Sequence, residues 1–328
     1  MGGVPHTKPL VEIKSLVVRF DSVAVLRGID LTVDRGESLG LVGESGCGKS
    51  VTWLAALGLL GSRAEIDGAV HLDGENILGA PPARLDKVRG GRLAMIFQDP
   101  TSALNPVHTI GHHVAEALRL HRGMDARGAR AETRRLLDWV GIPGAARRME
   151  AYPHELSGGQ NQRVMIAVAL AGQPDLLIAD EPTTALDVTI QAQILDLLQQ
   201  VQRETGMALV LISHDLGVIA ETCDRISVMY AGRIVEEAST EALFDAALHP
   251  YSRGLLGALP RTEGPRQRLT SIPGMVADPS ALPAGCSFAP RCSERVAACN
   301  AAEPALTAAM RCGAAHRAAC VHVVGSAA

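Results

Sequence analysis

The sequence predicts an α/β fold in which a mostly parallel sheet carries helices on both faces. Three apolar runs of strand length predict the sheet, at residues 38–42, 176–181 and 207–212. The first two runs are each followed by a helical pattern, which is typical of layered α/β units. Alternating segments at residues 10–20, 24–33 and 69–78 predict a small antiparallel sheet, and Asp73-Gly74 predicts a hairpin turn in the last of them.

Length and composition limit the classes of protein that fit. A chain of 328 residues with 47% hydrophobic residues can form two or three units with a sizeable core, and 3% aromatic residues make that core aliphatic. The net charge of −4 disfavours a broad nucleic-acid-binding surface, so no nucleic-acid partner is expected. Charged residues interrupt every apolar run near the start, and no run reaches the ~18 residues of a membrane span. We therefore expect a soluble cytoplasmic chain that reaches a membrane only through a partner.

The strongest motif is the segment of residues 43–50, which reads G-x-x-x-x-G-K-S. It lies between a predicted buried strand and a predicted helix at residues 51–60, the context of a nucleotide phosphate-binding loop. Glycines let the backbone amides approach phosphate, and the positive end of the helix adds to the field. Lys49 is expected to reach the β- and γ-phosphates, and the Ser50 hydroxyl to bind Mg²⁺. The predicted phosphate contacts are Gly43, Ser45, Gly46, Cys47, Gly48, Lys49, Ser50 and Val51.

Two carboxylates end the buried strand of residues 176–181. Asp180 suits Mg²⁺ bound through water, and Glu181 suits polarising an attacking water molecule. A strand that simply ends in surface acids is the alternative, and the phosphate-binding loop earlier in the chain argues against it. His214 follows the next strand, at the sheet edge where ligands bind in α/β proteins, so a γ-phosphate contact is expected there.

A helical insertion is predicted between the strands, with helices at residues 106–121 and 126–140. After it, Ser157, Gly158 and Gly159 precede a helix expected at residues 161–171 and predict a second anion site. Phe20 ends the first strand, 23 positions before Gly43 (43 − 20), and two interpretations of it stay open from the pattern alone. It could stack on adenine, or it could pack in the core.

Six motifs follow one another along the chain: the loop, Gln98, residues 156–160, residues 180–181, Asp187 and His214. This set and its order resemble those of the ATP-binding subunit of ATP-binding cassette (ABC) transporters. The likeness covers residues 10–245 and implies a RecA-like P-loop NTPase that hydrolyses MgATP. It also implies that Phe20 stacks on adenine, that Gln98 binds Mg²⁺ and senses the membrane partner, and that Asp187 couples two sites. A second cassette, two transmembrane permeases and an extracytoplasmic binding protein would be the partners.

Finer features resemble the dipeptide and oligopeptide importers of this family. They are residues 96–106, residues 152–155, and the segment His249-Pro250-Tyr251 that opens a C-terminal extension. The resemblance implies a nucleotide-binding domain at residues 8–246, with its helical subdomain at about residues 99–160, and an extension at residues 247–328. It also implies import of peptides at the cytoplasmic face of the membrane. Nickel chelates or glutathione are alternative cargoes. A non-transport cassette ATPase is a less favoured alternative.

Five of the seven cysteines crowd the extension, where prolines indicate loops with little core. A bound metal could stabilise such a segment, and four thiolates can hold a [4Fe–4S] cluster. Some members of the resembling subfamily carry such a cluster in this extension. The expected ligands are Cys286, Cys292, Cys299 and Cys320, with Cys312 as a possible replacement for one of them. Zinc, or no metal at all, are the alternatives.

Overall fold

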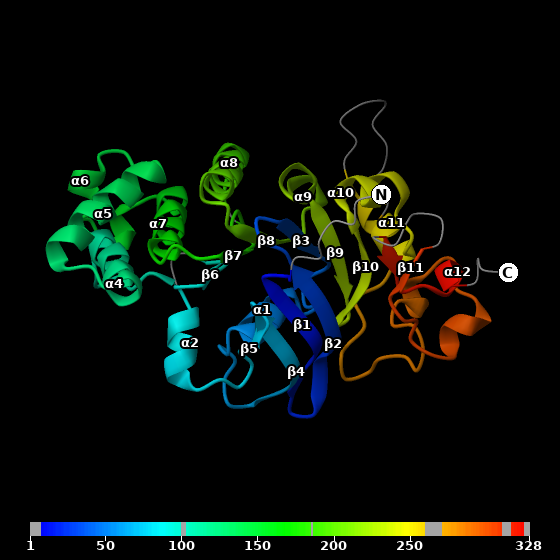
Figure 1. The fold of residues 1–328 in the computed structure, drawn as a ribbon. Coiled ribbons are helices and arrows are strands. Elements are labelled where there is room, and N and C mark those ends of the chain that lie inside the picture. The colour runs from blue at the N-terminus through cyan, green and yellow to red at the C-terminus, as the bar shows by residue number, and fades with distance from the viewer. Residues whose placement is uncertain (1–7, 100–102, 185, 260–270, 310–315, 325–328) are drawn as a thin grey trace, which may run out of the picture. The chain divides into compact units, whose positions relative to one another are not determined.

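The computed structural model describes residues 8–99, 103–184, 186–259, 271–309 and 316–324. Contacts divide the chain into two compact units (Figure 1). The first unit contains residues 1–33, 38–78 and 211–328, and the second contains residues 34–37 and 79–210. In the part of the chain that the structure describes, no helix is long and apolar enough to cross a membrane.

The first unit contains a four-stranded antiparallel sheet in the order β2-β1-β4-β5. Its strands are β1 (Val11–Phe20), β2 (Val23–Val33), β4 (Ala64–Leu72) and β5 (Glu75–Asn76). The predicted Asp-Gly turn joins β4 to β5, with positive φ angles at both Asp73 and Gly74. This backbone geometry is the one that suits a two-residue hairpin. The strand before the turn begins at Ala64, earlier than the alternating pattern suggested.

A second set of strands in the first unit has the order β11-β12-β10-β9-β3. The strands are β3 (Ser38–Val42), β9 (Arg225–Tyr230), β10 (Arg233–Ser239), β11 (Thr307–Ala308) and β12 (Arg317–Ala318). The β3 and β9 strands are parallel and almost fully buried, whereas β10 turns back antiparallel and pairs with β12 of the extension. The helices of this unit are α1 (Lys49–Ala56), α9 (Leu216–Thr222), α10 (Thr240–Ala246), α11 (Pro250–Gly257) and α12 (Val321–Val324), with short 3-10 turns η2 (Ala289–Arg291) and η3 (Ala297–Asn300).

The second unit combines parallel strands with a helical cluster. Strand β6 (Leu93–Ile96) is parallel to β7 (Leu176–Asp180), and β8 (Ala208–Ser213), which crosses the boundary between the units, follows β7 in the sheet. The helices are α2 (Pro82–Val88), α4 (Ile110–Arg122), α5 (Ala126–Trp139), α6 (Ala145–Arg148), α7 (Gly158–Ala171) and α8 (Val188–Thr205), with the 3-10 turn η1 (Pro153–Glu155).

Side-chain caps set the true ends of several helices. The helix expected from residue 106 begins at Ile110, because the Thr109 hydroxyl accepts a hydrogen bond from the His112 amide at 3.3 Å. The helix expected from residue 161 begins at Gly158. Ser157 and Gln160 bond reciprocally there at 3.3 and 3.2 Å and close the first turn. The apolar pattern placed both starts incorrectly because the capping residues, and not the first apolar residues, set where a helix begins. The first helix starts later than the pattern suggested, and the second starts earlier.

The helical insertion is held by one apolar face and by an ion-pair network. Ile110, Val114 and Leu118 of α4 are fully buried, as their spacing predicts. On the polar side, Glu132 accepts hydrogen bonds from Arg135 at 2.8 and 2.9 Å and from Arg122 at 2.8 Å. These bonds, from Arg135 foremost, lower the pKa of Glu132 to about 2.

The C-terminal extension does not stand apart from the first unit. Strand β12 pairs with β10 through Ala318 and Glu236. Buried His316 donates a hydrogen bond from Nε2 to the Glu236 carboxylate at 2.8 Å. The contacts therefore group residues 211–328 together, whereas the sequence suggested a boundary near residue 247. That boundary remains a prediction about domain organisation.

Candidate functional site

The phosphate-binding loop of residues 43–50 joins β3 to α1 in the first unit. Its backbone takes positive φ angles at three glycines: Gly43 at 154°, Gly46 at 80° and Gly48 at 104°. A Cβ atom on Gly43 would lie 2.2 Å from the Met229 carbonyl oxygen, and one on Gly48 would lie 2.6 Å from a methyl of Leu26. Larger residues would strain the loop, so these glycines are required by its path against β9 and β2.

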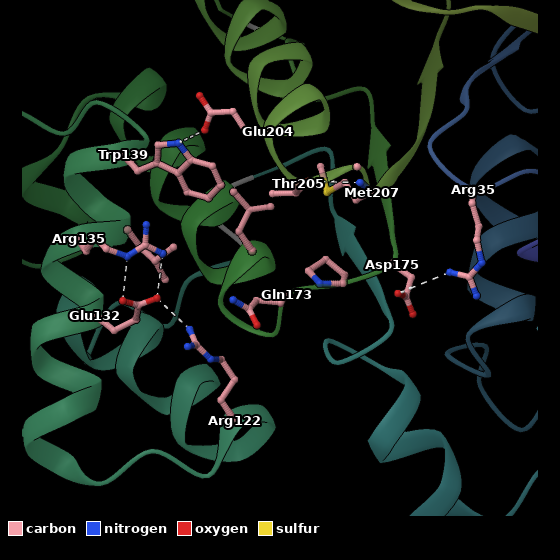
Figure 2. A pocket seen from close by; sticks show the side chains of 14 residues that line it. Arg35, Arg122, Glu132, Arg135, Trp139, Gln173, Asp175, Glu204, Thr205 and Met207 are labelled. Carbon is pink, nitrogen blue, oxygen red and sulfur yellow. Dashed lines mark hydrogen bonds and ion pairs between the residues drawn. The ribbon is translucent and has the colours of Figure 1, made fainter.

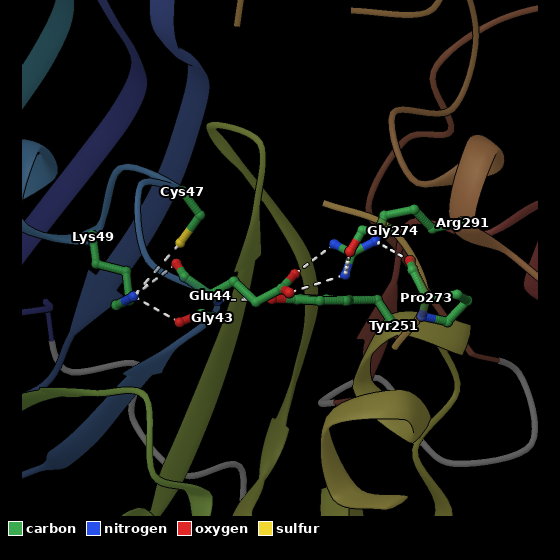
Figure 3. A network of polar contacts seen from close by, with 8 residues as sticks. All are labelled: Gly43, Glu44, Cys47, Lys49, Tyr251, Pro273, Gly274 and Arg291. Carbon is green, nitrogen blue, oxygen red and sulfur yellow. Dashed lines mark hydrogen bonds and ion pairs between the residues drawn. The ribbon is translucent and has the colours of Figure 1, made fainter. Parts of the chain in front are cut away.

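Lys49 lies inside the curve of this loop, where only 6% of its surface is exposed. Its ammonium donates hydrogen bonds to the carbonyl oxygens of Gly43 at 2.7 Å and Glu44 at 3.1 Å, and it lies 3.8 Å from the Cys47 sulfur (Figure 3). Burial raises the pKa of the Cys47 thiol, so it stays protonated at neutral pH. The lysine is the group of this loop that carries positive charge.

In the second unit the structure brings together two residues from separate motifs. Because β6 and β7 are parallel, with Ile96 opposite Ala179, their carboxyl ends meet at one edge. There the Gln98 side-chain amide donates to the Glu181 carboxylate at 3.0 Å, and the Thr184 hydroxyl donates to the same oxygen at 2.9 Å. Glu181 takes a positive φ of 47°, rare for a residue with a side chain, and such strain is typical of functional positions.

Asp180, the last residue of β7, is buried beside Glu181. The two carboxylates thus differ in surroundings: one lies in the sheet core, and the other turns into the edge where Gln98 and Thr184 hold it. This difference suits the separate roles predicted for them.

The serine–glycine–glycine segment also lies in the second unit, at the start of α7. Its glycines allow close packing on the next functional segment, since a Cβ atom on Gly159 would lie 2.7 Å from a methyl of Ile190 in α8. Asp187 caps α8 and accepts a hydrogen bond from the Ile190 amide at 3.0 Å. The α7 start, with exposed Ser157 and Gly158, is therefore packed on the same turn of α8 that Asp187 begins.

The remaining predicted residues lie in the first unit. Phe20 ends β1 and is half-buried, so it is not a fully buried core residue. His214 follows β8 and is exposed. The predicted site residues are thus shared between the units: Phe20, the loop and His214 in one, and Gln98, residues 157–159, residues 180–181 and Asp187 in the other.

One cavity of the second unit, about 540 Å³, is lined by none of the predicted nucleotide-site residues. It lies beside Asp175 and Met207, which precede β7 and β8, and thus at the amino-terminal ends of these strands (Figure 2). Ligands of α/β sheets bind at the carboxyl ends instead. Its polar lining is largely satisfied internally, since Trp139 donates to Glu204 at 2.9 Å and Arg122 and Arg135 both bond Glu132.

The four cysteines predicted as metal ligands line one very small cavity of about 10 Å³, together with His249 and Phe288 among others. The Cys286 amide donates to the Cys299 carbonyl at 2.8 Å. Burial raises the pKa of the Cys286 thiol to about 11, and it also raises the pKa values of Cys292 and Cys320. Without a metal these thiols are protonated at neutral pH.

The structure does not support the iron–sulfur prediction directly. In the described part of the chain, no group of three or more His, Cys, Asp or Glu side chains has an arrangement that could hold a metal ion. The thiols gather around one cavity without adopting such an arrangement. Cys312, the proposed substitute ligand, lies outside the described residues.

Sequence reasoning missed the action of two residues on the phosphate-binding loop from outside it. Arg291 pairs with the Glu44 carboxylate, and Tyr251 accepts a hydrogen bond from the Glu44 amide (Figure 3). The sequence indicated Tyr251 only as part of a subfamily motif, with no role at the loop. No local signal could have joined them to Glu44, because 247 positions separate Arg291 from it.

Comparison with known proteins identifies the family of the chain. Residues 26–184 match the ABC transporter family model, and residues 235–299 match the model of the oligopeptide/dipeptide transporter C-terminal region. A peptide import ATP-binding protein of Brucella abortus is 49% identical over 306 residues, which cover 92% of each chain. The chain belongs to the ATP-binding proteins of the ABC-type peptide importers.

Other relatives of this ABC subunit extend the comparison. The oligopeptide transport ATP-binding protein OppD of Haemophilus influenzae is 48% identical, over 91% of this chain and 94% of its own. Among solved structures, the ABC transporter component cbiO1 of Clostridium perfringens has a TM-score of 0.63 and 26% identity, over 73% of this chain and 92% of its own. A dimeric ATP-binding cassette, MJ0796, bound to ADP and phosphate, has the same TM-score at 28% identity, over 70% and 98% of the two chains. The P-loop NTPase fold expected from the sequence is thereby confirmed.

Proposed function

We propose that this ABC subunit binds and hydrolyses MgATP to drive the uptake of dipeptides or oligopeptides through partner permeases. The observation that carries this function is the hydrogen bond between Gln98 and Glu181, two residues from separate motifs that meet at the carboxyl edge of parallel strands. The phosphate-binding loop, whose path requires glycines, would bind the phosphates of ATP. The names of the relatives support peptides as the cargo.

Each predicted site residue has a separate role in ATP binding or hydrolysis. Lys49 exchanges its bonds to the loop carbonyls for bonds to the β- and γ-phosphates, and Phe20 stacks on adenine. Glu181 accepts a proton from water as it attacks the γ-phosphate in line, held by Gln98 and Thr184. His214 contacts the γ-phosphate from the end of β8. Ser50 and Gln98 would hold Mg²⁺ directly, and Asp180 would hold it through water. The bound ion would supply positive charge against the charge that develops on the phosphates.

The signature segment of residues 157–159 serves a second subunit. Two cassettes would close around ATP, each adding its signature helix to the loop of the other, with Asp187 coupling the two sites. The second cassette is either another copy of this chain or a paralogue. Two permeases would hold this pair at the cytoplasmic face of the membrane, and an extracytoplasmic binding protein would deliver the cargo.

The cargo can be tested with the importer reconstituted in vesicles from this subunit, its cassette partner, the permeases and the binding protein. Peptides of two to about six residues should be taken up in an ATP-dependent manner and should compete with one another. Glutathione and a nickel chelate are the matched alternatives. Uptake of either in preference to peptides would replace the peptide assignment while leaving the ATPase role intact.

We further propose that Cys286, Cys292, Cys299 and Cys320 hold a [4Fe–4S] cluster with a structural role, with zinc as the competing metal. The proposal rests on the donor set, since four soft thiolates are what either metal takes. The thiols line one small cavity, and they would have to rearrange around it to bind a metal. Loading must displace the thiol protons that burial retains, so it should be favoured by higher pH.

Replacing Cys292 by serine tests the cluster. Anaerobically purified wild-type protein should contain about four iron and four sulfide per chain. The C292S variant should contain far less and should unfold at a lower temperature. Cys223→Ala, a buried cysteine elsewhere in the first unit, is the control and should retain the metal. Unchanged folding and ATPase activity in C292S would exclude a structural role, and zinc without iron in the wild type would change the metal.

A further inference from the structure

Glu44, the second residue of the phosphate-binding loop, is held through all three of its polar groups. Its carbonyl oxygen accepts from Lys49 at 3.1 Å, inside the loop. Its amide donates to the Tyr251 hydroxyl at 2.8 Å, and its carboxylate receives two bonds from Arg291, at 2.6 and 3.0 Å. The last two partners come from the C-terminal extension and lie on the outer side of the loop (Figure 3).

Arg291 is fixed on its own side of this contact. Its side chain is only 5% exposed, and its Nε donates to the Pro273 carbonyl at 2.8 Å. The guanidinium carbon lies 5.9 Å from the ring centres of both Tyr230 and Phe288. A two-point bond from a buried, preordered guanidinium is among the stronger polar contacts in proteins.

Tyr251 is equally constrained. It lies in the first turn of α11 and is fully buried. Its ring packs 4.7 Å from the Tyr230 ring of β9 and 5.4 Å from Phe288, measured between centroids. The amide of Tyr251 donates to Nδ1 of His249 at 3.1 Å, which caps the helix. The hydroxyl is therefore delivered to the Glu44 amide by a rigid aromatic cluster.

These contacts matter for a site that binds a polyanion. An unpaired carboxylate in the phosphate-binding loop would repel the phosphates, and Arg291 pairs this one. The Glu44 amide already donates its hydrogen bond to Tyr251, on the outer side of the loop, so it does not face the phosphate. Phosphate is thus left to the amides of the residues that follow Glu44.

We propose that Arg291 and Tyr251 are positioning residues of the nucleotide site: through Glu44 they hold and neutralise the phosphate-binding loop, so that MgATP affinity depends on the C-terminal extension. Neither residue touches the nucleotide. The extension thereby contributes to the ATPase site of its own chain.

The test measures MgATP dissociation constants and steady-state kinetics for a small set of variants. Arg291→Met keeps an apolar stem against Tyr230 and Phe288 but removes the charge, and it should weaken MgATP binding about tenfold. The turnover at saturating ATP should stay within about twofold, because the bond acts on binding. Arg253→Met is the matched control. It breaks the exposed pair with Glu294 in the same unit and should change neither quantity.

The double variant E44Q/R291M separates charge neutralisation from general destabilisation. Removing the Glu44 charge should restore affinity to within about threefold of wild type, since no unpaired carboxylate then faces the phosphates. Equal weakness of R291M and the double variant would contradict the neutralising role. If R291M does not fold, Tyr251→Phe tests the same contact by removing one hydroxyl, with an expected loss of a few-fold in affinity. Unchanged affinity in both single variants would overturn the positioning role.

Because this role presupposes the ATP site proposed above, the wild-type protein separates the two failures. A wild-type chain that binds no MgATP contradicts the proposed function itself. If the wild type binds MgATP and the R291M and Y251F variants bind it equally tightly, only the role of the extension is contradicted.

Discussion

Replacing Glu181 by glutamine is expected to reduce ATP turnover about a hundredfold or more while leaving MgATP binding almost unchanged. A positioned general base contributes a factor of this size to a hydrolysis rate. Glutamine keeps the shape of the side chain, and its amide oxygen can still accept from Gln98 and Thr184. Binding depends mainly on the phosphate-binding loop, which lies elsewhere in the chain.

The measurement is steady-state phosphate release at saturating ATP, with the dissociation constant determined separately. Asp196→Asn is the control, because it removes an exposed carboxylate from α8 in the same unit. It should leave turnover unchanged. Wild-type turnover in the Glu181→Gln variant would mean that this carboxylate takes no part in hydrolysis.

The second large effect is expected at Lys49. Replacing it by alanine should weaken MgATP binding about a hundredfold, because two or more charge-assisted bonds to phosphate oxygens are lost. The substitution also removes the internal donor to the carbonyl oxygens of Gly43 and Glu44, so the loop itself should lose order. Titration with a fluorescent ATP analogue measures this loss.

A surface lysine gives the matched comparison. Lys14 is in the same unit, is more than half exposed and pairs with Glu12 at 2.9 Å. Its replacement by alanine should not change the affinity. Lys49→Ala protein that binds MgATP as tightly as the Lys14→Ala protein would show that the segment of residues 43–50 is not the phosphate site.

Local patterns were sufficient to predict most of the phosphate-binding loop and its neighbours. The three glycines with positive φ, the buried strand before them and the helix that follows are all consequences of short-range sequence. The same holds for the Asp73-Gly74 hairpin and for the buried face of α4. Each of these features could be predicted from residues only a few positions apart.

The rest depends on contacts between distant segments. The meeting of Gln98 with Glu181 follows from the parallel register of β6 and β7, which no local pattern encodes. The pairing of Arg291 with Glu44 joins the extension to the loop across 247 positions. Helix starts were misplaced for another reason. The reciprocal bonds of Ser157 and Gln160 set the start of α7 before its apolar repeat begins.

The metal site predicted in the extension rests on the number and spacing of its cysteines. Their number suggested a metal site, and the structure gathers Cys286, Cys292, Cys299 and Cys320 around one cavity. In the residues that the structure describes, however, this cluster does not have the arrangement of a metal site. Iron and sulfide analysis of the purified protein tests whether the cysteines hold a cluster.

The most direct test of the account is the ATP turnover of the reconstituted importer with and without peptide-loaded binding protein. If the subunit couples ATP hydrolysis to peptide uptake, the loaded binding protein should raise turnover several-fold, and Glu181→Gln should abolish both the stimulation and the uptake. Turnover that is unaffected by peptide, or peptide uptake that persists in Glu181→Gln, would contradict the coupling of this site to peptide transport.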